Sequence, residues 1–417
     1  MNADRHTRPF DIVLCGATGF TGGLVAERLA SASRAQPLRW ALAGRDPGRL
    51  DEVRRRLSAQ EPSCHDLPIL VGDARDAAAM ADIAAQTRVI CTTVGPFARH
   101  GSALVAACAR KGTDYCDITG EVQWIRRMID AHHHEARASG ARIVPTCGFD
   151  SIPSDLGVLL LQDEMLRRHG RRAHRVTAFF GETRGSFSGG TFASLMAALD
   201  EADDEAVRQV IADPYGLDPV PRQGGPDGPD PRGVGYDRAM KVFTAPFVMA
   251  VVNTRVVRRS HALLGYPWGH DFRYREVMSF PANAKGLATA VGLTATIGGF
   301  LLATARPGGL RRLIARRLPA PGTGPSAEAR TQGHFVVRVV GEGDPAEPGE
   351  SPPRLVVTVS DDADPGYGST SKMLSQSALC LAFDPVPAAG GVLTPATALG
   401  TRLIERLRAM GLRFDAA

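Results

Sequence analysis

The stretch DIVLCGATGFTGGLVAERLA, residues 11–30, decides the fold. It begins with Ile12, Val13 and Leu14, a short apolar run with β-branched residues that is typical of a strand buried on both faces. From residue 24 onward, apolar residues recur at helical spacing, so we expect a helix to begin near residues 21–22. The segment therefore predicts a buried strand that turns directly into a helix.

Three glycines lie in the turn between this strand and helix, with a G-x-x-G-x-x-G spacing. One allows a sharp turn, one lets a pyrophosphate approach the backbone, and one lets the helix pack closely on the strand. The unpaired N–H groups of the helix start would face the anion. The alternative is a purely structural turn. The residues assigned to the dinucleotide cradle are Gly16, Thr18, Gly19, Phe20, Thr21 and Gly22.

The end of the second predicted strand favours NADP(H). Residues 38–43 form this strand, and Arg45 follows it about two dozen residues after the glycine turn. An NAD site usually has a carboxylate at this position, whereas an arginine suits the 2′-phosphate of NADP. Asp46 comes next, which leaves dual cofactor use open, and a surface arginine in a turn is the structural alternative. We interpret the turn as an NADP(H) cradle.

Alternating strands and helices continue to residue 150, which predicts a parallel, doubly wound Rossmann sheet over residues 1–150. Asp73 ends the third strand and would either bind the adenine amino group or cap the next helix. Gly95 and Pro96 end the fourth strand, at the sheet edge where cofactor and substrate meet. We expect this pair to lie against the nicotinamide ribose.

Beyond residue 150 the pattern changes. Residues 151–370 read as an inserted α+β domain for substrate binding or dimerisation, and residues 371–417 as helices that return to the Rossmann domain. The runs 334–343 and 353–362 predict an antiparallel strand pair. A helix is expected within residues 186–202.

Residues 286–305 contain no charge and are followed by several arginines. Three interpretations stay open: a buried helix pair, a wall for a lipid-like substrate, and a membrane-surface segment with basic flanks. The length could cross a bilayer, but the Gly, Ala and Thr content makes the stretch only weakly hydrophobic.

Composition is that of an ordinary globular protein. The 417 residues are 44% hydrophobic and 22% charged, and a formal net charge of +5 does not argue for a nucleic-acid partner. Seven cysteines without a C-x-x-C pair indicate core residues in a reducing cytoplasm. The polar amino terminus predicts no signal peptide.

Consecutive histidines 132–134 point in different directions on a helix, so we assign no metal and expect a polar helix face.

Eight motifs, spread in order over nearly the whole chain, resemble those of the saccharopine dehydrogenase-like oxidoreductases. They are GATGFTG, LAGR, TTVGPFARHG, GTDYCDITGE, CGFDSIPSDLG, SGGT, DPGYGSTSKM and GGVLTPATALG. The resemblance is strongest to the actinobacterial branch that includes the mycobacterial trans-acting enoyl reductases. True saccharopine reductases carry a G-x-G-x-x-G turn, so the departure at residues 16–22 puts lysine metabolism in doubt.

The resemblance implies an NADP(H)-dependent enzyme. In that branch, hydride goes to an α,β-unsaturated thioester carried by a polyketide synthase that lacks its own reductase domain, and the products feed cell-envelope lipids and glycolipids. It also implies peripheral membrane contact by a cytoplasmic protein. We further expect a homo-oligomer.

Such a reaction needs a proton at the α carbon and stabilisation of the thioester oxygen. The candidates lie in two motif-rich turns after the fourth and fifth strands, and each could instead cap a helix or support a loop. Asp150 with Ser151 before Pro153 would make a good cap. The candidate catalytic residues are Tyr115, Asp117, Glu121, Asp150 and Ser151.

Two other functions stay open. One is a catalytically silent NADP(H)-binding protein that docks on membranes or lipid bodies, since no proton donor stands out. The other is an amino-acid dehydrogenase of the saccharopine reductase type, which would need a cluster of basic residues to hold several substrate carboxylates.

Overall fold

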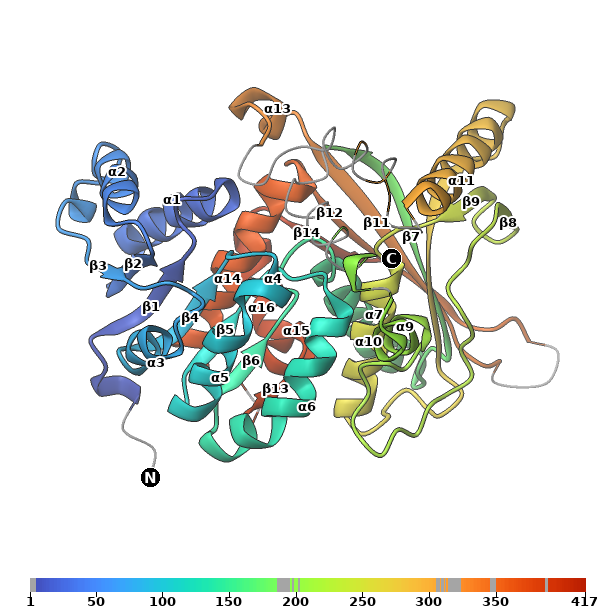
Figure 1. Ribbon diagram of the computed structural model, residues 1–417. Helices are drawn as coiled ribbons and strands as arrows, with labels where there is room; N and C mark the ends of the chain where they lie inside the picture. The colour runs from blue at the N-terminus through green and yellow to red at the C-terminus, as the bar shows by residue number, and fades with distance from the viewer. Residues whose placement is uncertain are drawn as a thin grey trace.

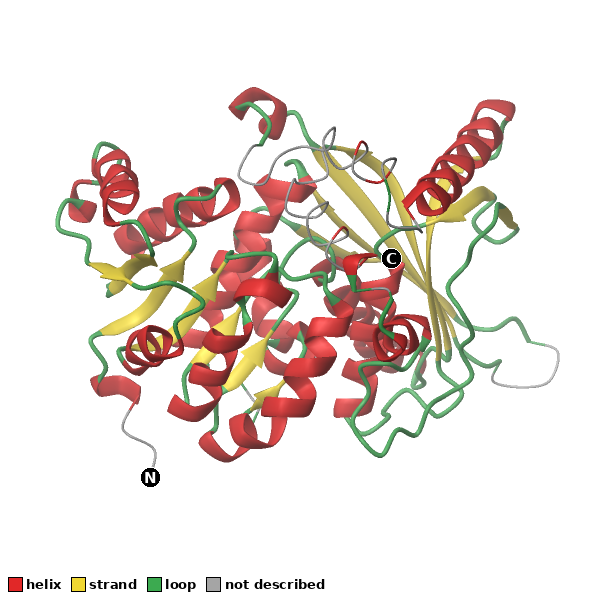
Figure 2. Ribbon diagram, viewed as in Figure 1, coloured by secondary structure: helices red, strands yellow, loops and turns green. Residues whose placement is uncertain are grey.

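The computed structural model describes residues 5–185, 196, 199–201, 203–304, 308, 311, 313, 324–345, 350–386 and 389–417. Over these residues the chain forms two seven-stranded sheets, with helices around and between them (Figures 1 and 2). Most of the helix predicted within residues 186–202 lies outside the described residues.

The first sheet is parallel throughout, in the order β13-β6-β5-β4-β1-β2-β3. Its central strands are buried on both faces, as the apolar run at residues 12–14 predicted. The order reverses between β1 and β4, which makes this a Rossmann sheet with its switch point beside the glycine turn. The strands are β1 (Phe10–Cys15), β2 (Trp40–Gly44), β3 (Ile69–Val71), β4 (Thr87–Thr92), β5 (Asp114–Cys116), β6 (Arg142–Val144) and β13 (Gly391–Val392).

Helices cover both faces of this sheet (Figure 1). Those of the first part of the chain are α1 (Phe20–Ala35), α2 (Pro47–Ser58), α3 (Ala77–Ala85), α4 (Phe97–His100), α5 (Ser102–Lys111) and α6 (Val122–Ser139), with 3-10 turns at Arg5–Thr7 and Pro62–Cys64. The helix-start rules hold at α2, where the Asp46 side chain accepts from the Arg49 amide and Pro47 occupies the first position.

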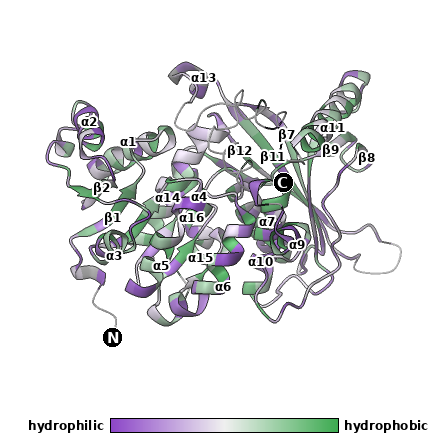
Figure 3. Cartoon of the chain, viewed as in Figure 1, coloured by the Kyte–Doolittle hydropathy of each residue, from purple (hydrophilic) through white to green (hydrophobic). Residues whose placement is uncertain are grey.

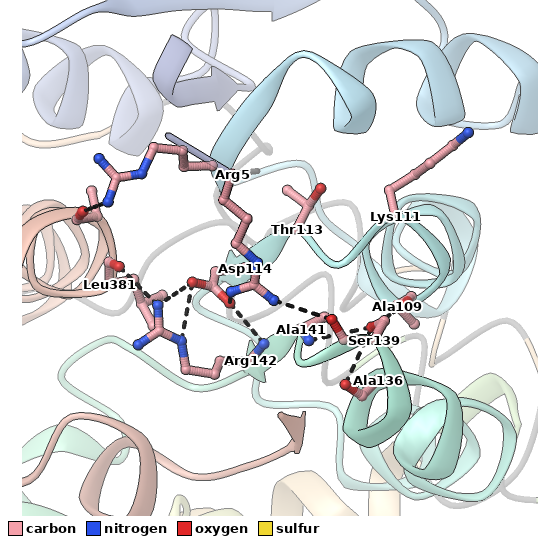
Figure 4. Close-up of polar contacts among 12 residues, drawn as sticks. Arg5, Ala109, Lys111, Thr113, Asp114, Ala136, Ser139, Ala141, Arg142 and Leu381 are labelled. Atoms are coloured by element: carbon pink, nitrogen blue, oxygen red, sulfur yellow. Dashed lines mark hydrogen bonds and ion pairs between the residues drawn. The ribbon is translucent and has the colours of Figure 1, made fainter. Parts of the chain in front are cut away.

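At the amino-terminal ends of the strands, the buried Asp114 carboxylate holds β5 and β6 together, as Figure 4 shows. Asp114 accepts from the Arg142 amide at 2.8 Å and from its Nε at 3.0 Å, and also from Arg5 Nη1 at 3.3 Å. Arg142 in turn donates to the carbonyl of Leu381 at 3.0 Å. These contacts tie β5 and β6 to the carboxy-terminal part of the chain, on the side opposite to the glycine turn.

The second sheet has the order β14-β12-β11-β7-β10-β9-β8 and is mixed, because only β7 and β10 run parallel. The predicted antiparallel pair is confirmed as β11 and β12. The strands are β7 (Arg175–Arg184), β8 (Gly235–Asp237), β9 (Val242–Pro246), β10 (Arg273–Pro281), β11 (His334–Glu342), β12 (Arg354–Asp361) and β14 (Arg413–Ala416).

Two helices join the sheets through a common core. α14 packs on β1, β4 and β5, while α7 packs on β11 and β12, so apolar side chains of both sheets belong to one cluster. The remaining helices are α7 (Ile152–His169), α9 (Glu205–Ala212), α10 (Ala250–Leu263), α11 (Ala284–Thr304), α13 (Ala327–Thr331), α14 (Thr370–Phe383), α15 (Pro395–Ala398) and α16 (Gly400–Ala409), with a helical turn at Pro365–Ser369.

The carboxy-terminal segment contributes to both sheets. β13 pairs with β6, and β14 pairs with β12 in the second sheet. The helix α10 and the strand β10 were not predicted. The sequence predicted only helices for residues 371–417, so β13 and β14 were missed as well. Short strands completed by distant partners carry little periodicity of their own.

The described part of the apolar segment, residues 286–304, lies in one helix, α11, and not in a buried pair. α11 projects from the second sheet (Figure 1), and only 11% of an apolar 18-residue stretch of this helix is buried. Its hydrophobic colouring in Figure 3 continues to the projecting end. It is the one helix in the described chain that is long and apolar enough to cross a membrane. Of the three interpretations that the sequence left open, the buried helix pair does not fit the described residues, because an apolar pattern does not specify which surface covers it.

The seven cysteines are buried free thiols, as predicted. The histidine run differs in part from its predicted polar face, since His133 is half-buried and its Nδ1 accepts from the Val392 amide at 3.2 Å. No group of three or more His, Cys, Asp or Glu in the described ranges could hold a metal ion.

Candidate functional site

The predicted site residues gather at the carboxyl edge of the Rossmann sheet. The loops after β1, β4, β5 and β6 meet there, next to the switch point between β1 and β4. Open α/β sheets bind their ligands in this crevice.

The glycine turn is built by close backbone contact. Gly16 has a φ of +92°, and a Cβ there would lie 2.7 Å from Thr93 Oγ1. A Cβ on Gly22 would lie 2.1 Å from the Gly16 carbonyl oxygen, far inside van der Waals contact. Both positions therefore require glycine for the fold itself, the first for its backbone conformation and the second for the approach of α1.

Gly19 is different, because protein packing does not account for it. Its φ of −84° and ψ of 167° are open to any residue, and a Cβ would meet only the Gly16 oxygen, at 3.4 Å. It occupies the N-cap of α1, where no side chain caps the free N–H groups. An uncapped helix start beside an open glycine fits a pyrophosphate, which takes the space that a side chain would fill.

Arg45 stands exposed directly after β2. Within the described part of the chain its guanidinium has no hydrogen-bond or ion-pair partner, so it is free to bind a phosphate. The neighbouring Asp46 carboxylate is occupied at the start of α2, which argues against a ribose contact there. A hollow of about 280 Å³ between the glycine turn and α2 is lined by Thr18, Arg49, Glu52, Val53 and Arg56.

Asp73 does not cap the next helix. Asp76 caps α3 instead, accepting from the Ala78 and Ala79 amides. The Asp73 carboxylate binds Arg75, with 2.9 Å to Nη2 and 2.9 Å to the backbone amide. These hydrogen bonds from Arg75 hold the pKa of Asp73 well below its usual value. Its adenine role stays a prediction.

Gly95 and Pro96 belong to a loop that Glu121 holds in place. The Glu121 carboxylate accepts from the Phe97 amide at 2.8 Å and from the Ala98 amide at 2.7 Å. On the other side, Thr93 Oγ1 donates to the Gly16 carbonyl at 3.3 Å. Glu121 is 1% exposed, so it supports this loop from the protein interior.

Tyr115 and Asp117 form a sealed pair. Both are 0% exposed, and the Tyr115 hydroxyl donates to Asp117 Oδ2 at 2.7 Å. Asp117 Oδ1 accepts from the amides of Thr119 and Thr146, each at 3.0 Å. Burial raises the pKa of Asp117 to about 7 and that of Tyr115 well above its usual value. In this arrangement neither group reaches a substrate, and Asp117 instead joins the loops after β5 and β6.

Ser151 is also sealed and does not cap α7 with its side chain, although it occupies the N-cap position. Its hydroxyl donates to Asn253 Oδ1 at 3.1 Å, and Asn253 donates to the buried Glu276 at 2.9 Å. The predicted cap is therefore wrong in its side-chain contact, because a partner 102 residues away competes for the hydroxyl.

Asp150 is the one candidate in this set that stays open. Its side chain is partly exposed, and it makes no hydrogen bond or ion pair with any residue that the structure describes. Burial alone raises the pKa of Asp150 to about 6.

One part of the site was not assigned a role from the sequence. The Tyr367 ring packs edge-on against Phe20 at 4.8 Å, and the Arg330 guanidinium lies 5.3 Å from the Phe20 ring centre. The DPGYGSTSKM motif thus lies against the glycine turn. Its position in the sequence, more than 340 residues downstream, does not indicate this contact.

Comparison with known proteins agrees with this geometry. The family model for the saccharopine dehydrogenase NADP binding domain matches residues 12–144. The trans-acting enoyl reductase of Mycobacterium ulcerans (strain Agy99) is 41% identical, covering 98% of each chain. That of Mycobacterium leprae (strain TN) is 39% identical, covering 97% of each chain. The chain belongs to the saccharopine dehydrogenase-like trans-acting enoyl reductase family.

The fold agrees as well. Saccharopine dehydrogenase (L-Glu forming) from Saccharomyces cerevisiae superposes with a TM-score of 0.56 at 12% identity, covering 98% of this chain and 99% of that one. Together with the NADP-binding family model, these relatives make the chain an NADP-dependent oxidoreductase of this family. The free Arg45 and the open glycine turn are the features that suit this dinucleotide.

Proposed function

We propose that this oxidoreductase reduces the α,β double bond of an unsaturated acyl thioester, with NADPH as reductant. The observation that carries the proposal is the identity of about 40%, over almost the whole chain, to proteins named trans-acting enoyl reductase.

The surroundings of Asp150 support an acyl substrate. Phe149, Phe247 and Met249 are partly exposed apolar side chains on neighbouring loops. Phe247 stacks on Phe180 with ring centres 3.8 Å apart, and Phe149 meets Phe335 edge-on at 4.7 Å. An apolar wall of this kind binds a hydrocarbon chain better than the several carboxylates of an amino-acid adduct.

The arrangement of the site indicates what the cofactor and the protein would each contribute to the reaction. The bound dinucleotide supplies the hydride. The glycine turn and the loop held by Glu121 orient it, while the apolar side chains position the enoyl group and exclude water. The protein then needs to deliver one proton to the reduced chain.

We extend the proposal to the partner and the setting. A reductase that acts in trans must receive its substrate from another protein, so we assign an acyl carrier domain of a polyketide synthase as the donor. The products would enter polyketide-derived lipids and glycolipids. We also propose that the enzyme works as a homo-oligomer in the cytoplasm.

α11 supports docking of this enzyme on a lipid bilayer. Residues 286–304 carry no charge, and Leu302 is 81% exposed. The hydroxyls of Thr289, Thr294, Thr296 and Thr304 each donate to the carbonyl four residues earlier, at 2.7–2.9 Å. These hydroxyls therefore need no water, and no charge interrupts the exposed surface of the helix over residues 286–304.

The test is NADPH oxidation with enoyl thioesters of short and long chain, presented on pantetheine and on an acyl carrier domain. We expect stoichiometric loss of NADPH and a saturated acyl product two mass units heavier, with faster turnover on the carrier domain. Gly19→Val serves as the matched control that lacks the cofactor. No turnover on any thioester would refute the reductase and leave a silent NADP(H)-binding protein, whereas NADP⁺-dependent oxidation of an amino-acid adduct would favour the saccharopine-type reaction.

A further inference from the structure

The sequence offered five acidic or hydroxyl side chains as catalytic candidates, and four of them have structural partners. Tyr115 and Asp117 satisfy each other, Glu121 holds the loop after β4, and Ser151 binds Asn253. Asp150 differs from all of these. It has no partner among the described residues, and none of its oxygens is sealed from solvent. A recessed carboxyl without a structural role is unusual, because burying such a group without a hydrogen bond is costly.

The position of Asp150 connects it to the hydride-transfer end of the site. Its Oδ2 lies 4.0 Å from the place that a Cβ on Gly120 would occupy, and the Met249 methyl lies 3.3 Å from the same point. Gly120 immediately precedes Glu121, whose carboxylate holds the amide next to Pro96. One short loop thus separates Asp150 from the residues that we expect to border the nicotinamide ribose.

The other carboxylates of this region bind backbone amides or side chains, and none of them contacts Asp150 among the described residues. On the loop after β5, the carboxylates of Asp117 and Glu121 face backbone amides. Beside Gly120, the groups that α10 and the residue before it contribute are the apolar Val252 and Met249. Further away, Asp155 accepts from Ser260 and Ala396, and Glu276 accepts from Ser154, Tyr274 and Asn253. Burial raises the pKa of Asp150, and no charge on a described residue contributes to that shift.

We propose that Asp150 is the proton donor of the reduction. This assignment rests on the proposed enoyl reductase function. The β carbon of the enoyl group takes the hydride with its electron pair, and the π pair of the double bond moves to the α carbon and thioester oxygen. The α carbon then takes the proton of the Asp150 carboxyl group, which is left as a carboxylate and regains a proton from water. The substrate gains two electrons and two hydrogens, NADPH loses the hydride, and one solvent proton is consumed.

The kinetic test compares Asp150→Asn with Asp163→Asn, which removes an exposed carboxylate at the far end of α7. General acids contribute about 100-fold to 10,000-fold, so kcat should fall at least about 100-fold in Asp150→Asn and stay unchanged in Asp163→Asn. The dissociation constant for NADPH should not change in either. The wild-type rate should fall as pH rises above the pKa of the donor, and that limb should be missing from the Asp150→Asn profile.

The second readout needs neither cofactor nor substrate. Because burial raises the folded-state pKa of Asp150 from 3.8 to about 6, the wild type loses stability as pH rises through that window. Asp150→Asn does not titrate, so the ratio of its unfolding constant to that of wild type should fall by about 100-fold between about pH 3, below the unfolded-state pKa, and pH values above about 6. Urea titrations of the free proteins measure this ratio.

The outcomes separate the two proposals. A wild-type enzyme that reduces no enoyl thioester would refute the reductase function and this role with it. Wild-type turnover combined with an Asp150→Asn rate within about threefold of it would refute the donor role alone. A stability ratio that does not change with pH would show that the carboxyl ionises freely, which would also overturn the assignment.

Discussion

The contrast between Gly22 and Gly19 gives a sharp test of the cofactor cradle. A Cβ at Gly22 would meet the Gly16 carbonyl oxygen at 2.1 Å and its carbon at 2.7 Å. Relief requires α1 and the turn to separate by roughly 1 Å, and overpacking of this kind typically costs about 1–3 kcal/mol. Replacing glycine by alanine in a helix returns up to about 1 kcal/mol. Gly22→Ala should therefore destabilise the free protein by about 1–2 kcal/mol.

Gly19→Val should behave in the opposite way. Its backbone lies in the extended region that valine favours, and its Cβ would have ordinary contacts, so stability should change by less than about 1 kcal/mol. Its side chain would occupy the space that suits the pyrophosphate. We expect at least a 100-fold loss of NADPH affinity.

Urea denaturation without cofactor, followed by circular dichroism, measures the stability of both variants. Titration of NADPH fluorescence measures affinity in the folded proteins. A Gly22→Ala protein as stable as wild type would contradict the packing argument. A Gly19→Val protein that binds NADPH normally would show that the glycine turn is only structural.

Two further predictions concern the predicted phosphate-binding residue and the exposed helix α11. Arg45→Ala should weaken NADPH binding by about 1.5–3 kcal/mol and NADH binding much less, because a charge-assisted phosphate contact is lost; equal losses in calorimetric titrations with the two cofactors would refute the 2′-phosphate assignment. Leu302→Asp should release the protein from liposomes in co-sedimentation without lowering its melting temperature, because Leu302 is 81% exposed, whereas Leu166→Asp, on an exposed face of α7, should leave liposome binding unchanged. If Leu302→Asp still binds lipid like wild type, α11 is not the lipid-docking surface.

The sequence alone predicted the Rossmann half of the fold and the NADP(H) cofactor, while the residues assigned to the cradle stay a prediction. The strand at residues 12–14, the three glycines and the helix after them are close in the chain, so local conformation and spacing determine their geometry. The same is true of Arg45, which needs only the end of β2 to place it at the sheet edge.

The five catalytic candidates could not be ranked in this way. Tyr115, Asp117 and Asp150 look equivalent along the chain, since the sequence assigns each to a motif-rich turn, although Tyr115 lies within β5. The partners that seal Asp117 and Ser151 come from residues 29 and 102 positions away. Only the packed loops show that Asp150 is left open.

The apolar segment and the carboxy-terminal strands show the same limit. The apolar composition of residues 286–305 left a buried, a substrate-lining and a membrane-surface segment open. Only the structure shows that nothing in the described chain covers most of α11. β13 and β14 are too short to show a recognisable strand pattern in the sequence. They form because partner strands in two different sheets complete their hydrogen bonds. Sequence determines local conformation and the chemistry of each side chain, whereas burial, and with it the pKa and accessibility of a group, is decided by what tertiary structure brings against it.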